Sequence, residues 1–164
     1  MSTTKTYIGT KMIHARPMTR QAYNDYRGWQ LPDNEDGADD GYLVEYVDGD
    51  KANDPRHAGY SSWSPKEVFE RSYRASHDMT FGQALEALKV GQRVARKGWN
   101  GKGQFVYLVT GESLQNTLKY GYGEYVGEPT IQSALAIKTT ANQIQVGWLA
   151  SQTDMLAEDW EILP

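Results

Sequence analysis

The sequence predicts an α+β protein, with a small, mostly antiparallel sheet packed by one long and one short helix and preceded by a small α+β N-terminal module. Short runs of alternating apolar and polar residues are typical of half-buried strands. Clusters of Gly, Asn and Asp separate these runs, as turns do. Ser64, Thr80 and Ser151 are each followed three residues later by Glu, Gln or Asp, a pattern that indicates the start of a helix.

The length and composition set the class of protein. The chain has 164 residues, 39% of them hydrophobic, which is enough for one ordinary domain or two small ones. No apolar run approaches the roughly 20 residues of a membrane-spanning helix, and the start of the chain lacks the apolar stretch of a signal peptide. We therefore expect a cytoplasmic location and no membrane partner. The sequence has no cysteine, which excludes disulfides, thiolate nucleophiles and Cys-based zinc sites.

Charge and aromatic content bear on the partners. The formal net charge of −4 argues against a nucleic-acid partner, because such proteins normally present a basic surface. The aromatic residues are unusual, with 5 Trp and 11 Tyr against only 3 Phe. Trp and Tyr join a flat apolar ring to a polar group and are favoured where a surface binds a ligand. Packing in the core of a small domain is the alternative for most of these rings.

Residues 1–76 are predicted to form the N-terminal module, whose role the sequence leaves open. We expect, in order, a strand within 11–19, a helix capped by Thr19 and ended by Gly28, an acidic loop over 30–41, a strand over 41–47 and a polar loop over 48–59. A second helix should follow, since Ser64 can cap it, Pro65 suits its first turn and Glu67 completes a capping box. It should run to about Arg74 and bury Val68, Phe69 and Tyr73.

Residues 79–164 are predicted to form the second domain. Thr80 and Gln83 form a capping box for a helix that ends at Gly91, and Ser151 and Asp154 form another for a short helix. The expected strands are 92–96, 104–110, 134–140, 143–150 and 159–163, with an irregular Gly- and Tyr-rich segment over 111–130.

Catalytic motifs are missing from the sequence. It contains no nucleophile elbow, phosphate-binding P-loop or zinc motif, and no metal-binding spacing links its histidines, His14, His57 and His77. Three neighbouring acids are compatible with acid–base chemistry or magnesium binding: Asp154, Glu158 and Asp159. Capping is the better interpretation, because acids at a helix start complement its dipole. We expect a protein that is not an enzyme, with no catalytic residue, metal or cofactor.

The stretch ARKGWNGKGQF, 95–105, sets a tryptophan and glycines among cations between two expected strands. Asn100-Gly101 is a strong hairpin signal, so a solvated turn is one interpretation. That interpretation leaves Trp99 unexplained, and with it the placement of five of the seven basic residues of 77–164 within 89–102. A flat indole beside cations suits a purine attached to phosphates, because the ring can stack on the base and the cations can bind the phosphates.

The stretch GWLASQTDMLAEDW, 147–160, is a second candidate for ligand binding. Trp148 ends a strand directly before a capped helix start, where backbone N–H groups attract anions and polar groups. Ser151, Gln152 and Thr153 add side chains that form hydrogen bonds. The alternative is that Trp148 and Trp160 belong to the core and that Ser151 only caps the helix.

These two stretches together closely resemble the second Thoeris anti-defence family of phage proteins. The resemblance covers Met79–Pro164 and is carried by MTFGQALEALKVGQRVARKGWNGKG at its start and GWLASQTDMLAEDWEIL at its end. Met79 matches the usual start of the family, so residues 1–78 are expected to be an added module, which itself resembles small phage segments of unknown role.

The resemblance implies a sponge that binds the cyclic ADP-ribose signal of bacterial TIR-domain defence proteins without cleaving it. Members form homotetramers with signal pockets at subunit interfaces, and some also bind cyclic dinucleotides at a separate site. Carried over to this chain, the ligand-binding residues are Arg96, Trp99, Asn100, Lys102, Phe105, Trp148, Ser151, Gln152 and Asp154. The two tryptophans would stack on bases, Asn100 and Gln152 would bind polar groups, and Lys102 or Arg96 would bind a phosphate. Asp154 would cap the short helix and so position the wall of the signal pocket.

The chain also departs from the family. Members usually have a Pro-aromatic pair at the start of the strand that here begins with Ser133-Ala134. Either an aromatic wall is missing or tyrosines replace it, the candidates being Tyr120, Tyr122 and Tyr125. This leaves the preferred cyclic nucleotide open. Two other functions also stay open: an enzyme that hydrolyses such nucleotides, and an adaptor that docks a host protein through residues 1–78.

Overall fold

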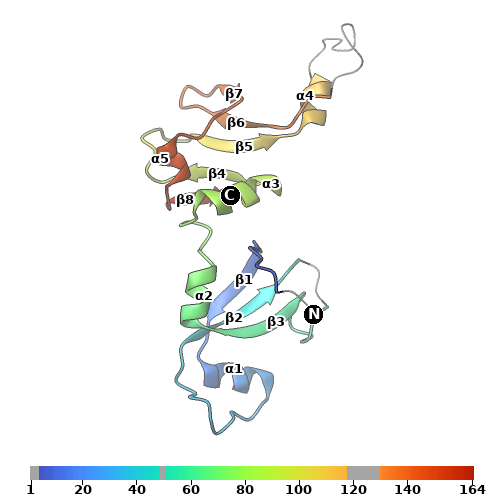
Figure 1. The fold of residues 1–164 in the computed structure, drawn as a ribbon, viewed down its shortest axis with the longest axis vertical. Coiled ribbons are helices and arrows are strands. Elements are labelled where there is room, and N and C mark those ends of the chain that lie inside the picture. Colours follow the sequence, from blue (N-terminus) through green and yellow to red (C-terminus); the bar gives the residue numbers. More distant parts are fainter. Residues whose placement is uncertain (1–3, 49–50, 118–129) are drawn as a thin grey trace. The chain divides into compact units, whose positions relative to one another are not determined.

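The structure, a computed structural model, describes residues 4–48, 51–117 and 130–164. The chain divides into two compact units, Met1–Arg74 and Ala75–Pro164 (Figure 1). Both units combine antiparallel sheets with short helices, which confirms the predicted α+β class. In the part of the chain that is described, no helix is long and apolar enough to cross a membrane.

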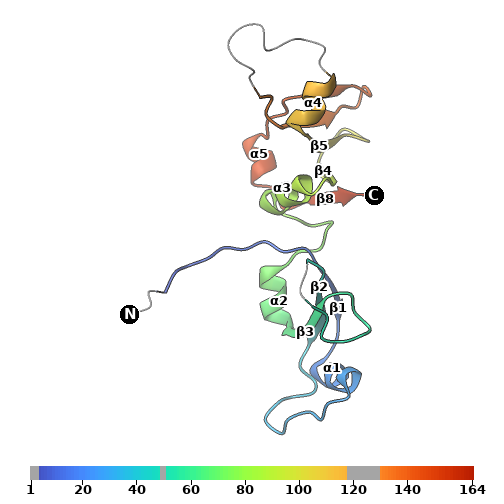
Figure 2. The same ribbon diagram turned by 90° about the vertical axis from the view of Figure 1, so that its right-hand side faces the viewer.

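The first unit is built on a three-stranded antiparallel sheet in the order β1-β2-β3 (Figures 1 and 2). Its elements are β1 (Ile13–Pro17), α1 (Arg20–Arg27), β2 (Gly41–Tyr46), β3 (Tyr60–Pro65) and α2 (Lys66–Ser72). The predicted caps of α1 are confirmed: the Thr19 hydroxyl accepts from the Ala22 N–H, and Gly28 ends the helix in the left-handed region at φ 69°. Helix α2 packs against β2 and β3, and the Phe69 ring stacks on Tyr42 with 4.0 Å between ring centroids.

The expected start of α2 is wrong by one residue, because sequence reasoning missed strand β3 and the cap is Pro65 instead of Ser64. Ser64 pairs with Tyr42 and Ser62 with Val44, so the ladder with β2 holds this segment extended as far as Pro65. Pro65 occupies the cap position and forms no side-chain cap hydrogen bond. The helix ends at Ser72 and buries none of its residues, with Val68 45% exposed.

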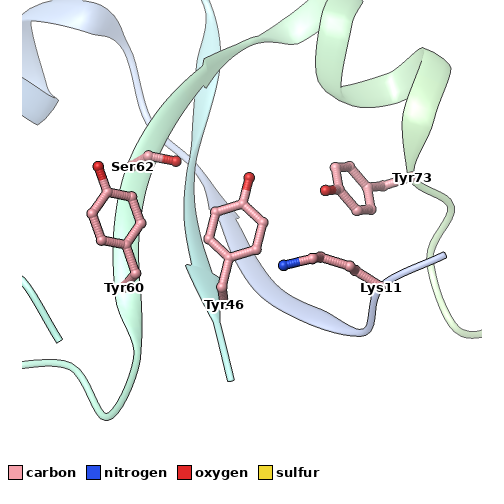
Figure 3. Close-up of a pocket in the computed structure, with 5 residues that line it drawn as sticks. All are labelled: Lys11, Tyr46, Tyr60, Ser62 and Tyr73. Carbon is pink, nitrogen blue, oxygen red and sulfur yellow. The ribbon is translucent and has the colours of Figure 1, made fainter. Parts of the chain in front are cut away.

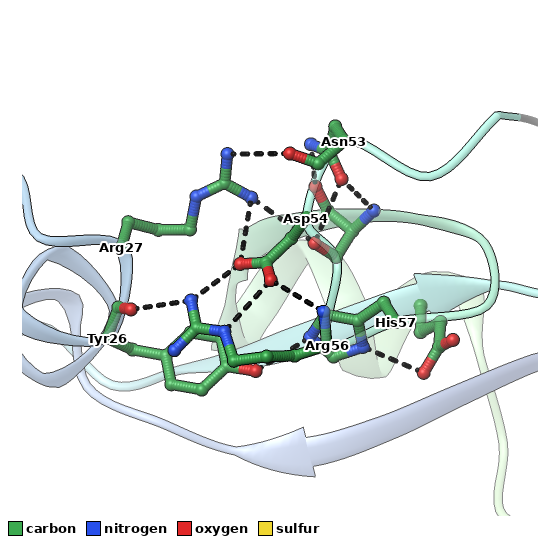
Figure 4. Close-up of polar contacts among 8 residues, drawn as sticks. Tyr26, Arg27, Asn53, Asp54, Arg56 and His57 are labelled. Atoms are coloured by element: carbon green, nitrogen blue, oxygen red, sulfur yellow. Dashed lines mark hydrogen bonds and ion pairs between the residues drawn. The ribbon is translucent and has the colours of Figure 1, made fainter.

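A polar network fixes the loop between β2 and β3 in the first unit (Figure 4). The Asp54 carboxylate is 5% exposed and accepts from Arg56 Nη2 at 2.6 Å, with Arg27 Nη1 at 3.8 Å. His57 bridges Glu45 and Tyr26, at 2.9 Å from each. The Asn53 side chain accepts from both the backbone N–H and the hydroxyl of Ser61. These bonds hold the backbone where β3 begins.

The second unit is built on a five-stranded antiparallel sheet in the order β7-β6-β5-β4-β8. Its strands are β4 (Arg93–Arg96), β5 (Phe105–Val109), β6 (Ala134–Lys138), β7 (Ile144–Val146) and β8 (Trp160–Leu163). Its helices are α3 (Phe81–Lys89), α4 (Gly111–Thr117) and α5 (Gln152–Met155). Both predicted capping boxes are confirmed: Thr80 with Gln83 at α3, and Ser151 with Asp154 at α5.

The core of the second unit lies between α3 and one face of the sheet. Ala84, Ala87 and Leu88 of α3 pack in one cluster with Met79 and four strand residues: Val94, Val106, Ile137 and Trp160. The Trp160 side chain is completely buried. Its backbone exchanges hydrogen bonds with Met79, so the last strand holds the segment that leads into α3.

Helix α4 corrects the expectation of an irregular segment over 111–130. The Thr110 hydroxyl accepts from the Ser113 N–H at the start of the helix. Gly111 suits this start because a Cβ there would lie 1.8 Å from the Ile131 carbonyl oxygen. Glycine is typical of loops, so Gly111 beside this cap made the sequence favour a loop instead of a helix. The rest of the segment, with Tyr120, Tyr122 and Tyr125, lies outside the described residues.

Replacing Trp160 with alanine should lower the free energy of unfolding of the second unit by about 3–5 kcal/mol, because it removes a fully buried indole. Urea denaturation followed by circular dichroism measures this loss. Trp29→Ala is the matched control, since Trp29 is 53% exposed in the first unit and should cost much less. If the Trp160→Ala variant is as stable as the control variant, the conclusion that the Trp160 ring stabilises the core of the second unit is wrong.

Candidate ligand-binding site

The structure brings the two tryptophan stretches together in the second unit. Trp99 lies in the loop 97–104 between β4 and β5, and Trp148 lies just after β7. Their ring centroids are 6.1 Å apart, and both rings contact Trp160, at 5.4 Å and 6.3 Å. Trp99 and Trp148 are half-buried and pack on the core of the unit. One continuous aromatic cluster, Trp99–Trp148–Trp160, therefore joins segments that are distant in sequence.

The three rings of this cluster meet edge to face. The interplanar angles are 71°, 75° and 76°, an arrangement in which the positive ring edge meets the negative face. Two rings that sandwich a base must be nearly parallel, so Trp99 and Trp148 do not form such a pair. A base can stack only on the exposed part of one of these rings.

The carboxylate of Asp154 fixes the orientation of Trp99. Its Oδ1 accepts from Trp99 Nε1 and from Arg96 Nη1, both at 2.9 Å, and its Oδ2 accepts from the Ser151 hydroxyl at 2.7 Å. Burial alone would raise the pKa of Asp154, but the hydrogen bonds from Trp99, Arg96 and Ser151 outweigh it and lower the pKa to about 2. Asp154 is thus a charged acceptor that joins β4, the loop and α5, as well as the predicted cap.

Arg96 is committed to two carboxylates. Its Nε donates to Asp159 Oδ1 at 2.8 Å and its Nη1 donates to Asp154, and the side chain is 13% exposed. Asp159 also accepts from the Gly98 N–H at 2.7 Å, where any Cβ at position 98 would collide with it. The geometry therefore gives Arg96 a structural role at the base of the loop and leaves Lys102 as the predicted cation for a phosphate.

The same ion pairs bear on the three neighbouring acids. Asp154 and Asp159 both face Arg96, so neither is free to act as a general acid or base. Among the described residues, no group of three His, Asp or Glu side chains could hold a metal ion. The capping interpretation of Asp154 agrees with this geometry.

The remaining predicted residues lie in different places. Asn100, Lys102 and Gln152 are exposed, and within the described ranges their side chains have no hydrogen-bond or ion-pair partner. Phe105 is separated from the cluster: Val106 packs in the core under α3, so its neighbour Phe105 points to the opposite face of the sheet. There the Arg93 guanidinium lies 5.3 Å from its ring. The alternation of β5 could have shown this separation from the sequence.

Sequence reasoning missed a set of exposed apolar side chains near this site. Leu149 is 88% exposed and Leu156 is 82% exposed, on either side of α5. Ile144 and Val146 are about half exposed on β7, which is an edge strand. The alternation of apolar residues with Gln in β7 was visible, but it does not tell whether the apolar face is covered.

The sequence comparisons agree with this organisation. The model of the Thoeris anti-defence 2-like domain matches residues 79–163, which lie entirely within the second unit. The chain belongs to this family. The Thoeris anti-defence 2 protein of Bacillus phage SP01 is 48% identical over 85 residues, which cover 52% of this chain and 94% of that relative.

Family membership confirms the resemblance drawn from the two tryptophan stretches. It supports a phage anti-defence protein, and the family description names no catalytic activity. Residues 1–78 lie outside the match.

Asp154→Asn should destabilise the second unit by about 2 kcal/mol at pH 7, because the folded state holds the carboxylate at a pKa of about 2 against an ordinary 3.8. A pKa that is lowered in the folded state stabilises the fold at pH values above the ordinary pKa of the carboxyl group. This contribution is lost as the pH falls from about 4 toward 2. The difference in urea unfolding free energy between the two proteins should shrink over that range. Asp33→Asn, an exposed acid, is the control. A difference that does not change with pH would contradict the charged role of Asp154.

Proposed function

We propose that this phage anti-defence protein is a sponge, which binds a cyclic nucleotide immune signal in the cytoplasm of the infected host and holds it uncleaved. The observation that carries the proposal is the placement of Asn100 and Lys102 on an exposed loop whose base is fixed by Asp154 and Asp159. A cyclic ADP-ribose isomer or a cyclic dinucleotide offers both a purine and phosphates to such a loop.

The chemistry of the site suits a purine-bearing anion. The exposed part of Trp99 or Trp148 can stack on a base, a contact worth about 1–3 kcal/mol. Lys102 can form a charge-assisted bond with a phosphate, and Asn100 and Gln152 can bind polar groups of the base or ribose. Nanomolar binding requires about 12 kcal/mol, which several such contacts can supply when the site is rigid before binding.

The paired acids support holding the signal rather than cleaving it. Hydrolysis of a phosphate or glycosidic bond needs a group that can take up or deliver a proton at the reacting atoms. Asp154 and Asp159 are bound to Arg96, and the low pKa of Asp154 keeps it deprotonated at neutral pH. This arrangement favours a role in sequestration over a role in acid–base chemistry.

The exposed apolar side chains support a homo-oligomer, for which we propose a tetramer. Leu149 and Leu156 flank α5 and expose more than four-fifths of their surface, and burial against a second copy would remove this apolar area from water. Trp148, Ser151 and Gln152 lie in the same short segment. If two copies associate through this segment, a neighbouring subunit lies beside the loop 97–104 and completes the walls of the signal site.

Isothermal titration calorimetry should detect tight binding of at least one cyclic ADP-ribose isomer or cyclic dinucleotide. After heat denaturation, chromatography should recover that ligand unchanged, because the protein only holds it. Recovery of a cleaved product would show an enzyme, and the absence of binding by every tested cyclic nucleotide would remove the proposal. Residues 79–164 alone should bind equally well, since the phage SP01 relative consists almost entirely of the matched region.

Lys102→Gln should weaken binding of the cyclic nucleotide about tenfold or more, because it removes the charge that faces the phosphate. Lys89→Gln is the matched control: Lys89 is also exposed but pairs with Glu86 on α3. Calorimetry at two salt concentrations separates a direct contact between Lys102 and the phosphate from long-range attraction between the charges, because salt screens the long-range attraction more strongly. Equal losses in both variants would indicate a general charge effect and argue against Lys102 as a direct partner.

A further inference from the structure

The first unit contains a hollow that the family match does not reach. Its volume is about 470 Å³, and it is lined by Lys11, Tyr46, Tyr60, Ser62 and Tyr73. Figure 3 shows the three phenol rings and the lysine around it, with Tyr46 between Tyr60 and Tyr73. Such a volume lies within the range of small-molecule sites in proteins.

The walls of this tyrosine hollow provide both ring faces and free hydroxyl groups. The Tyr46 and Tyr60 rings lie opposite each other on β2 and β3, with 6.4 Å between centroids, and Tyr60 is 43% exposed. The hydroxyls of Tyr60 and Ser62 have no hydrogen-bond partner among the residues that the structure describes. A structural role for these rings would bury them or pair their hydroxyls, and neither is the case for Tyr60.

Lys11 is the one cation among the described residues that line the hollow, and it is also available. The Lys11 ammonium lies 5.0 Å from the Tyr46 ring centroid and 3.7 Å from Asp48 Oδ1, with both charged side chains 45% exposed. An exposed ion pair at this distance contributes little, so an anionic ligand can replace it. Tyr73 forms the other wall of the hollow, beside Tyr46.

Hydrogen bonds hold the two strand walls of the hollow in place before any ligand binds. Glu45, next to Tyr46, accepts hydrogen bonds from the N–H groups of Ala58 and Gly59. Asn53 holds Ser61, which lies between Tyr60 and Ser62. The polar network of Figure 4 thus fixes the residues on either side of the two unpartnered hydroxyls. A preformed site loses less conformational entropy when a ligand binds.

We propose that the tyrosine hollow binds a planar anion of the nucleoside monophosphate class. The base stacks on Tyr60 or Tyr46, the phosphate binds the Lys11 ammonium, and the hydroxyls of Tyr60 and Ser62 donate to the phosphate or the ribose. This site is separate from the proposed signal site, and neither proposal depends on the other.

Calorimetry on the full chain tests the proposal with adenosine 5′-monophosphate, adenosine and inorganic phosphate as probes. The monophosphate should bind more tightly than either fragment, because only it reaches both the rings and the lysine. Tyr60→Ala should weaken its binding about tenfold or more. Lys11→Gln should weaken it severalfold, and Asp48→Asn should strengthen it by removing the opposing charge.

Two controls locate the binding. Tyr7→Ala, at a tyrosine 84% exposed outside the hollow, should leave the affinity unchanged. Lys102→Gln should also leave it unchanged, whereas it weakens the proposed signal site. Lys11 lies outside every helix and strand, so its variant reports on binding even if Tyr60→Ala disturbs the sheet.

Three results would overturn the proposal. The first is no binding of the monophosphate up to about 1 mM. The second is unchanged affinity in both Tyr60→Ala and Lys11→Gln. The third is phosphate binding as tightly as the monophosphate, since the rings would then have no part in recognition.

Discussion

The hydrogen-bonded, partly buried carboxylate of Asp154 is the group on which the second unit's candidate site depends. A charge that is 13% exposed is tolerated only because hydrogen bonds replace the water it has lost. Those bonds come from α5 through Ser151, from β4 through Arg96 and from the loop 97–104 through Trp99. The three segments therefore cannot move independently. Removing any one donor would leave part of a partly buried charge without a partner, which is why the loop has a defined shape although most of it is exposed.

The tryptophan cluster adds rigidity to this electrostatic anchor. Trp160 belongs to the core under α3, and Trp99 and Trp148 pack edge to face against it. An indole that is held on one side by the core and at its nitrogen by a carboxylate keeps its position when a ligand arrives. This rigidity suits the proposed sponge, because a preformed site loses less conformational entropy when the ligand binds. Because Trp99 and Trp148 are held at 71° to each other, they cannot stack on the two faces of one base.

Local signals were predictable from the sequence, and signals that depend on distant pairing were not. The capping boxes of Thr80 and Ser151 involve residues three apart, so the sequence alone contains both partners. Ser64 shows the same pattern, yet pairing with β2 draws it into a strand. The bond from Trp99 to Asp154 links residues 55 positions apart, and no periodicity indicates it. The sequence could not show, for the same reason, that Arg96 pairs with the carboxylates of Asp154 and Asp159.

The two units differ in where their polar groups are used. In the second unit, ion pairs anchor the loop that carries the exposed Asn100 and Lys102. In the first unit, the network around Asp54 and His57 fixes a loop that contributes little to the apolar core, and its effect falls on the start of β3. In each unit, fixed backbone thus lies beside polar groups that have no partner among the residues the structure describes: the hydroxyls of Tyr60 and Ser62 in the first unit and the Lys102 ammonium in the second. If both sites accept nucleotides, covalent linkage lets one chain hold two such anions at once, and the capacity of a sponge scales with its number of sites rather than with its affinity alone.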